Sequence, residues 1–353
     1  MDGETRSFLN VWLTAIAALC YCYYVTASLP PWKLRVLSLL PVIALFAALP
    51  LCISTVIPSG VTAFFLAWLC NSRLLLLAFD SGPLRQHKKS IPLFVTLACL
   101  PLNVRSESNR RGAPAARAPK LPFNWAAKIL LLAVLVTANG THCYKDANPK
   151  LLVAIYSCML YLLIDVVLGF FINAVRLLTG VDLEPPSNEP YLSTSLQDFW
   201  GRRWNLVVTD TLHQSVYVPL RRAAEPFLGR QWANFPAILA TFLVSGLMHE
   251  LLYYYVIRAY PTWEVTWFFV FHGICVAAEV RIKAAAAARG SRWRIHPAVS
   301  GPVAVTFVVV TGSWWFFPPL VRSGVDVRVI EECNAPVKLL WKALEYIGAR
   351  LNI

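Results

Sequence analysis

The feature that most constrains this chain is a series of eight long apolar runs. They are 18 to 28 residues long and cover 8–27, 34–53, 61–79, 121–138, 151–178, 233–257, 263–280 and 301–320. A helix of about 20 residues crosses the hydrocarbon core of a bilayer. Charged residues make up only 14% of the chain, against about 25% in soluble domains. We therefore predict an all-α, polytopic membrane protein that forms a single unit over residues 1–353, with about eight transmembrane helices.

Other segments refine this prediction. Pro122 and Lys128 interrupt the run 121–138, which makes it the weakest span. The apolar stretch 91–102 is only 12 residues long and contains two prolines, so we predict a re-entrant or interfacial segment. The first run follows two acidic residues and one basic residue, which is typical of a retained span rather than a cleaved signal peptide.

Basic residues are distributed unevenly among the loops. The segment 85–120 contains eight Lys or Arg residues and one acidic residue, so the positive-inside rule places the loop 80–120 in the cytosol. The same count places 179–232 on the cytosolic side and 139–150 on the opposite side. The net charge of +13 follows from this topology and does not indicate nucleic-acid binding. It suits anionic membrane lipids and anionic cytosolic substrates.

An ionisable pair, His249 and Glu250, lies inside the run 233–257. Such a pair costs a few kcal/mol at membrane depth unless it faces protein or water. Histidine transfers protons near neutral pH, so we predict a catalytic role for His249. A helix–helix hydrogen bond is the structural alternative. Ser245 and Phe242 share the face of His249, at i−4 and i−7, and should line a reaction chamber. Glu250 points about 100° away, so we predict a supporting role for it.

The loop 179–232 contains an aromatic and basic motif, Asp198-Phe-Trp-Gly-Arg-Arg-Trp-Asn205. Helical spacing places four apolar residues on one face: Leu196, Phe199, Trp200 and Trp204. Asp198, Arg202 and Arg203 fall on the other face. One interpretation is an interfacial helix whose aromatic face contacts the membrane. The other is a cytosolic mouth in which the arginines bind phosphates and the tryptophans line an apolar channel.

Motifs for metals and cofactors are missing from the sequence. His249 and Glu250 begin like a zinc-protease HExxH motif, but position 253 is Tyr. None of the nine cysteines forms a CxxC pair, and we find no glycine-rich phosphate loop and no GxSxG motif. We therefore predict no metal and no cofactor. His272 is a second histidine inside a span and a possible cavity residue.

Several stretches resemble the plant wax-synthase branch of the membrane-bound O-acyltransferase superfamily. They are FLNVWLTAIAALCYCYYV at 8–25, NSRLLLLAFDSGPL at 71–84, DFWGRRWN at 198–205 and SGLMHELLYYY at 245–255. The resemblance runs nearly end to end. It implies an acyl-CoA-dependent O-acyltransferase of the endoplasmic reticulum, with acyl-CoA as a co-substrate. It also implies that the conserved His and Asn of the family correspond to His249 and Asn205.

The chemistry of acyl transfer suits these two residue types. A thioester is already activated, so the difficult step is deprotonation of the alcohol, which a neutral imidazole can accelerate about 10²–10⁴-fold. An Asn amide can stabilise the oxyanion by about 3–4 kcal/mol. A long-chain fatty alcohol is the expected acceptor, and a sterol or diacylglycerol is the alternative. Two other classes are a lipid transporter, which usually shows repeated halves, and a non-catalytic lipid-binding protein.

The charge pattern generates a topological prediction. In an otherwise cysteine-free variant, single cysteines at Ser108 and Ser187 should react with an impermeant thiol reagent in microsomes whose cytosolic face is outward. A cysteine at Asn148 should react only after permeabilisation. Labelling at Asn148 but not at Ser187 in intact vesicles would invert the topology and contradict cytosolic entry of acyl-CoA.

Overall fold

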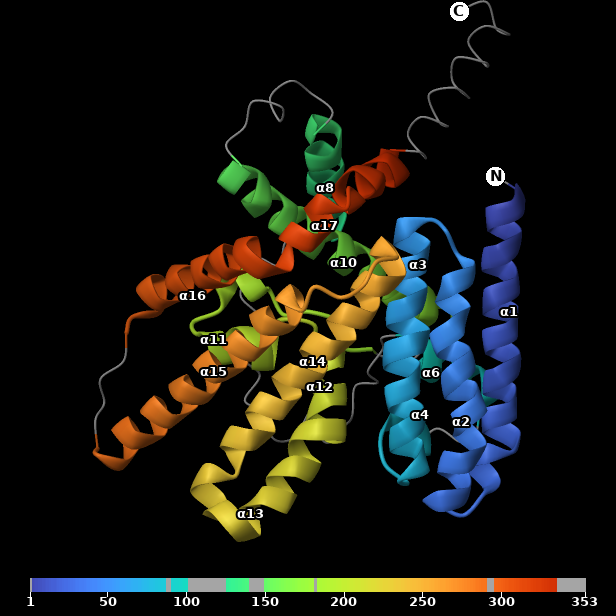
Figure 1. The fold of residues 1–353 in the computed structure, drawn as a ribbon, viewed down its shortest axis with the longest axis horizontal. Helices are drawn as coiled ribbons and strands as arrows, with labels where there is room; N and C mark the ends of the chain where they lie inside the picture. The colour runs from blue at the N-terminus through green and yellow to red at the C-terminus, as the bar shows by residue number, and fades with distance from the viewer. Residues whose placement is uncertain are drawn as a thin grey trace, which may run out of the picture.

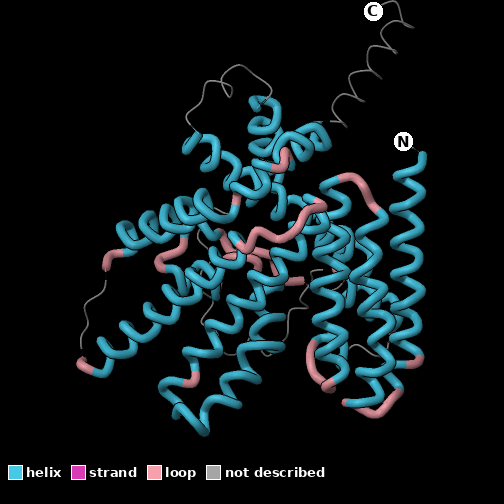
Figure 2. Tube along the Cα trace, in the orientation of Figure 1, coloured by secondary structure: helices cyan, strands magenta, loops and turns pink. Residues whose placement is uncertain are grey.

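The computed structural model of the chain describes residues 2–86, 90–100, 125–139, 149–180, 183–290 and 295–334. These residues form helices joined by loops (Figure 2). Among the described residues, seven helical segments are long and apolar enough to cross a membrane: Gly3–Ser28, Lys33–Cys52, Val56–Ala78, Leu151–Leu177, Asn234–Ile257, Glu264–Ala288 and Pro297–Phe316. The prediction of an all-α, multi-pass membrane protein is confirmed.

The first helices form a bundle on one side of the molecule (Figure 1). It contains α1 (Asp2–Tyr24), α2 (Lys33–Ala48), and a continuous rod of α3 (Val56–Thr62), η3 (Ala63–Cys70) and α4 (Asn71–Ala78). The short helix α6 (Ile91–Cys99) packs among them. The core of this bundle consists of fully buried apolar side chains, among them Leu19, Leu39, Phe46, Leu74 and Phe94. Apolar packing therefore holds the first hundred residues together.

A buried arginine, Arg73, joins α6 to the rest of this bundle. The guanidinium of Arg73 donates hydrogen bonds to the carbonyl oxygens of Leu97 and Leu100, the latter at 2.7 Å. The last carbonyls of a helix have no partner within the helix, so a cation at this position satisfies them. With nine residues, α6 is about 14 Å long, too short to span a bilayer. Whether 91–102 is re-entrant stays a prediction.

The helices α14 (Asn234–Ile257) and α15 (Glu264–Ala288) pack closely against each other. A Cβ atom at Gly246 would lie 3.0 Å from the Cα atom of Thr266, and one at Gly273 would lie 2.8 Å from the Cβ of Phe242. Real Cβ atoms have little or no room at such distances, so glycine permits the approach of the two helices. Helix α13 (Val218–Trp232) precedes α14, and α16 (Pro297–Thr311) follows α15.

The predicted span 121–138 is not among these seven segments, and its first four residues lie outside the described part of the chain. Its described part is α8 (Trp125–Asn139), whose 15 residues extend about 22 Å. The side chain of Lys128 is buried, and its Nζ donates to Asp165 at 2.9 Å and to Glu189 at 3.2 Å. Asp165 belongs to α10 (Pro149–Thr179). The lysine that interrupts the apolar run therefore fastens α8 to α10 and to the loop before the 198–205 motif.

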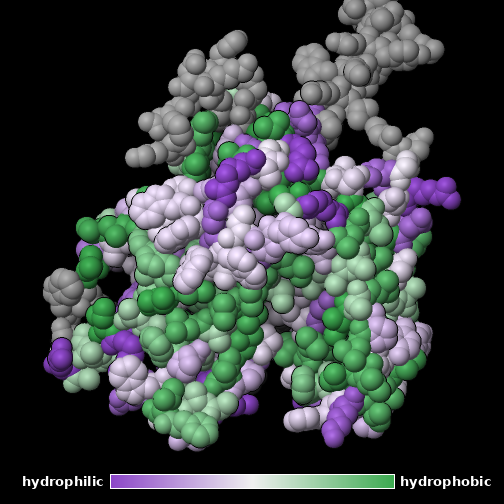
Figure 3. Space-filling view, in the orientation of Figure 1, coloured by the Kyte–Doolittle hydropathy of each residue, from purple (hydrophilic) through white to green (hydrophobic). Residues whose placement is uncertain are grey.

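Several turns of the chain lie at two ends of the molecule. The connections 29–32 and 79–82 and the α13–α14 junction lie at the lower end of Figure 1, whereas the N-terminus and the connection 53–55 lie at the upper end. Figure 3 shows apolar side chains over the helical faces between these ends. The placement of 79–82 and the α13–α14 junction at the same end agrees with the assignment of 80–120 and 179–232 to one side from loop charge. Which side faces the cytosol stays a prediction.

Within the loop 179–232, Ser187 and Asn188 differ in their accessibility to a thiol reagent. Ser187 is half-buried and its hydroxyl donates to Asp165, so a cysteine there would be poorly accessible. Asn188 is exposed and lies on the same loop, which makes it the better position. Ser108 and Asn148 lie outside the described residues.

Candidate active site

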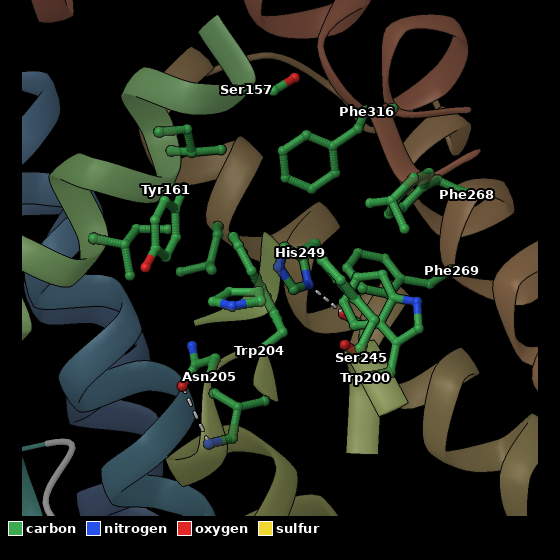
Figure 4. Close-up of a pocket in the computed structure, with 18 of the residues that line it drawn as sticks. Ser157, Tyr161, Trp200, Trp204, Asn205, Ser245, His249, Phe268, Phe269 and Phe316 are labelled. Carbon is green, nitrogen blue, oxygen red and sulfur yellow. Dashed lines mark hydrogen bonds between the residues drawn. The ribbon is translucent and has the colours of Figure 1, made fainter. Parts of the chain in front are cut away.

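A cavity of about 1070 Å³ lies between the N-terminal bundle, α10, α14, α15 and α16. Its lining is predominantly apolar and aromatic. His249 and Asn205, which are 44 residues apart in the sequence, both line it. Figure 4 shows their side chains on the same cavity. Tertiary folding thus brings together the two residues for which the sequence predicts catalytic roles.

The imidazole of His249 has a defined orientation. Its Nδ1 lies 2.7 Å from the carbonyl oxygen of Ser245, one helical turn earlier in α14 (Figure 4). A carbonyl oxygen only accepts hydrogen bonds, so Nδ1 carries the proton and donates. The lone pair of Nε2 is then available toward the cavity. This is the tautomer that a general base at Nε2 requires.

Three aromatic rings surround His249. The ring centroid of Phe269 in α15 lies 4.3 Å from that of the imidazole. Trp68 from η3 lies 5.3 Å away, and Phe316 from η7 (Gly312–Phe316) lies 5.9 Å away. These rings restrict the imidazole and make its surroundings apolar. None of the three was predicted, because no spacing in the sequence connects them to His249.

Asn205 has an unusual backbone conformation, with φ of 36° and ψ of 70°. Asparagine tolerates this left-handed region better than most residues. Its side-chain oxygen accepts a hydrogen bond from the backbone N–H of Val208 at 3.3 Å and so caps α12 (Leu206–Leu212). Because the N–H of Val208 requires an acceptor, the capping atom of the amide is its oxygen. The amide nitrogen remains as a donor on the cavity side (Figure 4).

The aromatic residues of the motif face the interior of the protein. Helix α11 (Leu196–Asp198) continues into the π-helical turn η5 (Phe199–Arg203). This wider turn stacks the ring of Phe199 on that of Trp204, with centroids 5.6 Å apart. Phe199, Trp200 and Trp204 all line the cavity. An interfacial helix with its aromatic face toward the membrane is therefore wrong, because these rings pack inside.

The charged residues of the motif lie outside the cavity lining. Nε of Arg203 donates to Asp198 at 2.8 Å, and its guanidinium also reaches the carbonyl oxygens of Asn188 and Glu189. Burial by itself raises the pKa of Asp198, but the hydrogen bonds from Arg203 and from a backbone N–H outweigh it and lower the pKa. Arg203 thus holds the two parts of the loop together through its bonds to Asp198 and to the backbone at 188–189. Arg202 is exposed.

Glu250 points away from the cavity, in agreement with its predicted supporting role. Its carboxylate accepts hydrogen bonds from the backbone N–H of Thr266 at 3.2 Å and from the Thr266 hydroxyl at 3.3 Å. Thr266 lies in the first turn of α15. A carboxylate at this position satisfies a free helix N–H group and complements the helix dipole. Glu250 therefore joins α14 to α15. The predicted chamber residues Ser245 and Phe242 do line the cavity.

The π-helical segments mark this site. In the part of the chain that the structure describes there are four: η3, η5, η6 (His213–Tyr217) and η7. Each contributes side chains to the cavity. Such turns are rare and frequently occur at functional sites, since the extra residue turns side chains to a new face. Among the described residues, no three His, Cys, Asp or Glu side chains are grouped so that they could hold a metal ion.

Comparison with known proteins identifies the family. Residues 183–271, which include Asn205 and His249, match the model of the membrane bound O-acyl transferase family. The chain is 43% identical to probable long-chain-alcohol O-fatty-acyltransferase 1 of Arabidopsis thaliana, over 94% of this chain and 96% of that protein. It is 42% identical to the long-chain-alcohol O-fatty-acyltransferase of Simmondsia chinensis, over 94% of each chain. This chain therefore belongs to the long-chain-alcohol O-fatty-acyltransferase branch of the membrane-bound O-acyltransferase family.

Proposed function

We propose that this protein makes wax esters by transferring a fatty acyl group from acyl-CoA to a long-chain alcohol. The observation that carries the proposal is the placement of His249 and Asn205 on one apolar cavity. Both relatives named above are acyltransferases with long-chain alcohols as acceptors, by their names. The cavity offers apolar walls for two aliphatic chains and polar groups where a thioester and a hydroxyl would meet.

His249 is the general base in the proposed reaction. Nε2 accepts the proton of the alcohol as the alcohol oxygen attacks the thioester carbonyl carbon. The Ser245 carbonyl, bonded to Nδ1–H at 2.7 Å, stabilises the resulting imidazolium. The carbon–sulfur bond then breaks, and the imidazolium returns the proton to the departing CoA thiolate. The reaction forms ester and CoA and leaves the enzyme without a net change in protonation.

Asn205 stabilises the negative charge that develops on the carbonyl oxygen of the thioester. Its amide oxygen is occupied by the N–H of Val208, so the nitrogen is oriented as the donor before substrate arrives. Preorganised donors of this kind contribute to catalysis because they need not reorient during the reaction. The apolar walls exclude water, which would otherwise hydrolyse the thioester.

Acyl-CoA enters from the cytosol in this proposal, in a membrane that we expect to be the endoplasmic reticulum. Its phosphates cannot cross the apolar cavity, so they stay at the loop that contains the 198–205 motif. The exposed guanidinium of Arg202 is the cation of this motif suited to bind them, since Arg203 is paired with Asp198. The alcohol, which partitions into lipid, enters from the membrane.

Expression in a yeast strain without its own neutral-lipid acyltransferases tests the proposal. Fatty alcohols, sterols and diacylglycerol are supplied, and the esters are identified. Wax esters are the expected product. Predominant sterol esters or acylated diacylglycerol would support the alternative acceptors, and uptake of labelled acyl-CoA without any ester would indicate a transporter.

In the same strain, His249→Ala should lower ester formation by about 10²–10⁴-fold, the range for loss of a general base. The variant should accumulate in the membrane like the wild type. Leu243→Ala, which truncates an exposed residue of the same helix, is the matched control. Retention of more than about a tenth of the activity by His249→Ala would contradict a role as base.

The Asn205 substitutions separate capping from catalysis. Asn205→Asp keeps an oxygen that can cap α12 but removes the amide donor, so we expect a folded protein with kcat reduced about 10²–10³-fold. Asn205→Ala removes the cap as well and should also lower the melting temperature in detergent. Near-normal kcat in Asn205→Asp would exclude donation to the oxyanion.

The two arginines should behave differently when replaced. Arg202→Gln should raise KM for acyl-CoA and leave kcat nearly unchanged, because only binding of the phosphates is weakened. Arg203→Gln should instead lower kcat and stability, because it removes the cation that pairs with Asp198. Measurement of kcat and KM for both variants decides between the roles. A collapsed kcat with unchanged KM in Arg202→Gln would show that Arg202 also supports the motif.

A further inference from the structure

His272 is a fully buried histidine that the proposed mechanism does not use. It lies in α15, within a predicted membrane span, and its exposed fraction is 0%. It does not belong to the cavity lining. A buried polar side chain is costly in an apolar environment unless its hydrogen bonds are satisfied. His272 therefore needs hydrogen-bond partners inside the protein.

Both ring nitrogens of His272 form hydrogen bonds. Trp200 Nε1 lies 3.0 Å from Nδ1, and Nε2 lies 2.8 Å from the hydroxyl oxygen of Thr311 in α16. An indole N–H only donates, so Nδ1 of His272 must be the acceptor and Nε2 must carry the proton. The Thr311 hydroxyl in turn donates to the carbonyl oxygen of Phe307 at 2.7 Å. Each group in this series therefore donates to the next one, from Trp200 through His272 and Thr311 to Phe307.

Trp200 connects this chain of hydrogen bonds to the catalytic histidine. Its indole lines the cavity and packs against Phe242 and Phe269, with centroids 5.8 Å and 5.6 Å away. The ring of Phe269 lies 4.3 Å from His249 (Figure 4). A displacement of the indole would therefore move the wall that faces the base.

We infer that His272 is a positioning residue for acyl transfer: as a neutral hydrogen-bond acceptor it fixes the indole of Trp200 in the cavity wall beside His249. This inference rests on the proposed function. His272 does not touch the substrates, since it is buried behind Trp200 and outside the cavity lining. It links α15 to the π turn η5, across 72 residues to Trp200, and to α16, across 39 residues to Thr311.

Two substitutions test the acceptor role of His272. His272→Leu introduces an apolar side chain of similar size and leaves the indole N–H without an acceptor. His272→Asn places an amide oxygen near the position of Nδ1, so an acceptor is retained. We expect kcat to fall on the order of tenfold or more in the leucine variant, because displaced contacts in an active site are costly. The asparagine variant should retain a substantial part of the kcat that the leucine variant loses. KM for acyl-CoA should change little in both.

A double-mutant cycle shows whether His272 acts through Trp200. Trp200→Phe removes the indole N–H, so adding His272→Leu to it should cost little further kcat. The same four proteins are melted in detergent, and the two substitutions should be non-additive there as well. This second readout does not require catalysis. Ile274→Ala, at an exposed position of α15, is the control.

The outcomes distinguish the inference from the proposed function. Full kcat in His272→Leu, or additive effects of the two substitutions in both kcat and melting temperature, would overturn the positioning role. A loss as large as that of His249→Ala without recovery by asparagine would make His272 a base and would also overturn it. No ester from the wild type with any acceptor counts against the proposed function, while the melting cycle still tests the Trp200–His272 bond.

Discussion

The active site depends on the close approach of α14 and α15. Gly246 and Gly273 allow the backbone of one helix to contact the other, and Glu250 completes the contact by binding the first turn of α15. His249 lies one residue before Glu250, so the same contact sets the position of the histidine that we propose as the base. Phe269, from the facing helix, then packs on its ring. Glu250 thus joins the two helices while its neighbour His249, on a different face of α14, lines the cavity.

Some polar side chains inside the molecule join segments of the protein, whereas others have one end that faces the cavity. Lys128 binds two carboxylates, Arg73 binds helix carbonyls and His272 bridges Trp200 and Thr311. Such partners are necessary because an unsatisfied polar group in an apolar interior costs several kcal/mol. His249 and Asn205 use only one end of each side chain in this way. The other end faces the cavity, where we propose that substrate completes its bonding.

Sequence patterns predicted the parts of the site that belong to a single helix. Helical spacing placed Phe242, Ser245 and His249 on one face, and the structure confirms that all three line the cavity. The same geometry predicted that Glu250 points elsewhere. The spacing argument was wrong about the aromatic face at 198–204, because a π turn and interior packing reorient those rings.

By itself, the sequence determined the class of this protein. Apolar runs of about 20 residues are long enough to cross a bilayer as helices, and loop charge divides their ends into two sides. Tertiary structure decided what surrounds His249. Trp68, Phe269 and Phe316 meet His249 from three different segments, and His272 reaches Trp200 across 72 residues. Contacts of this kind depend on how whole helices pack, and no local spacing encodes them.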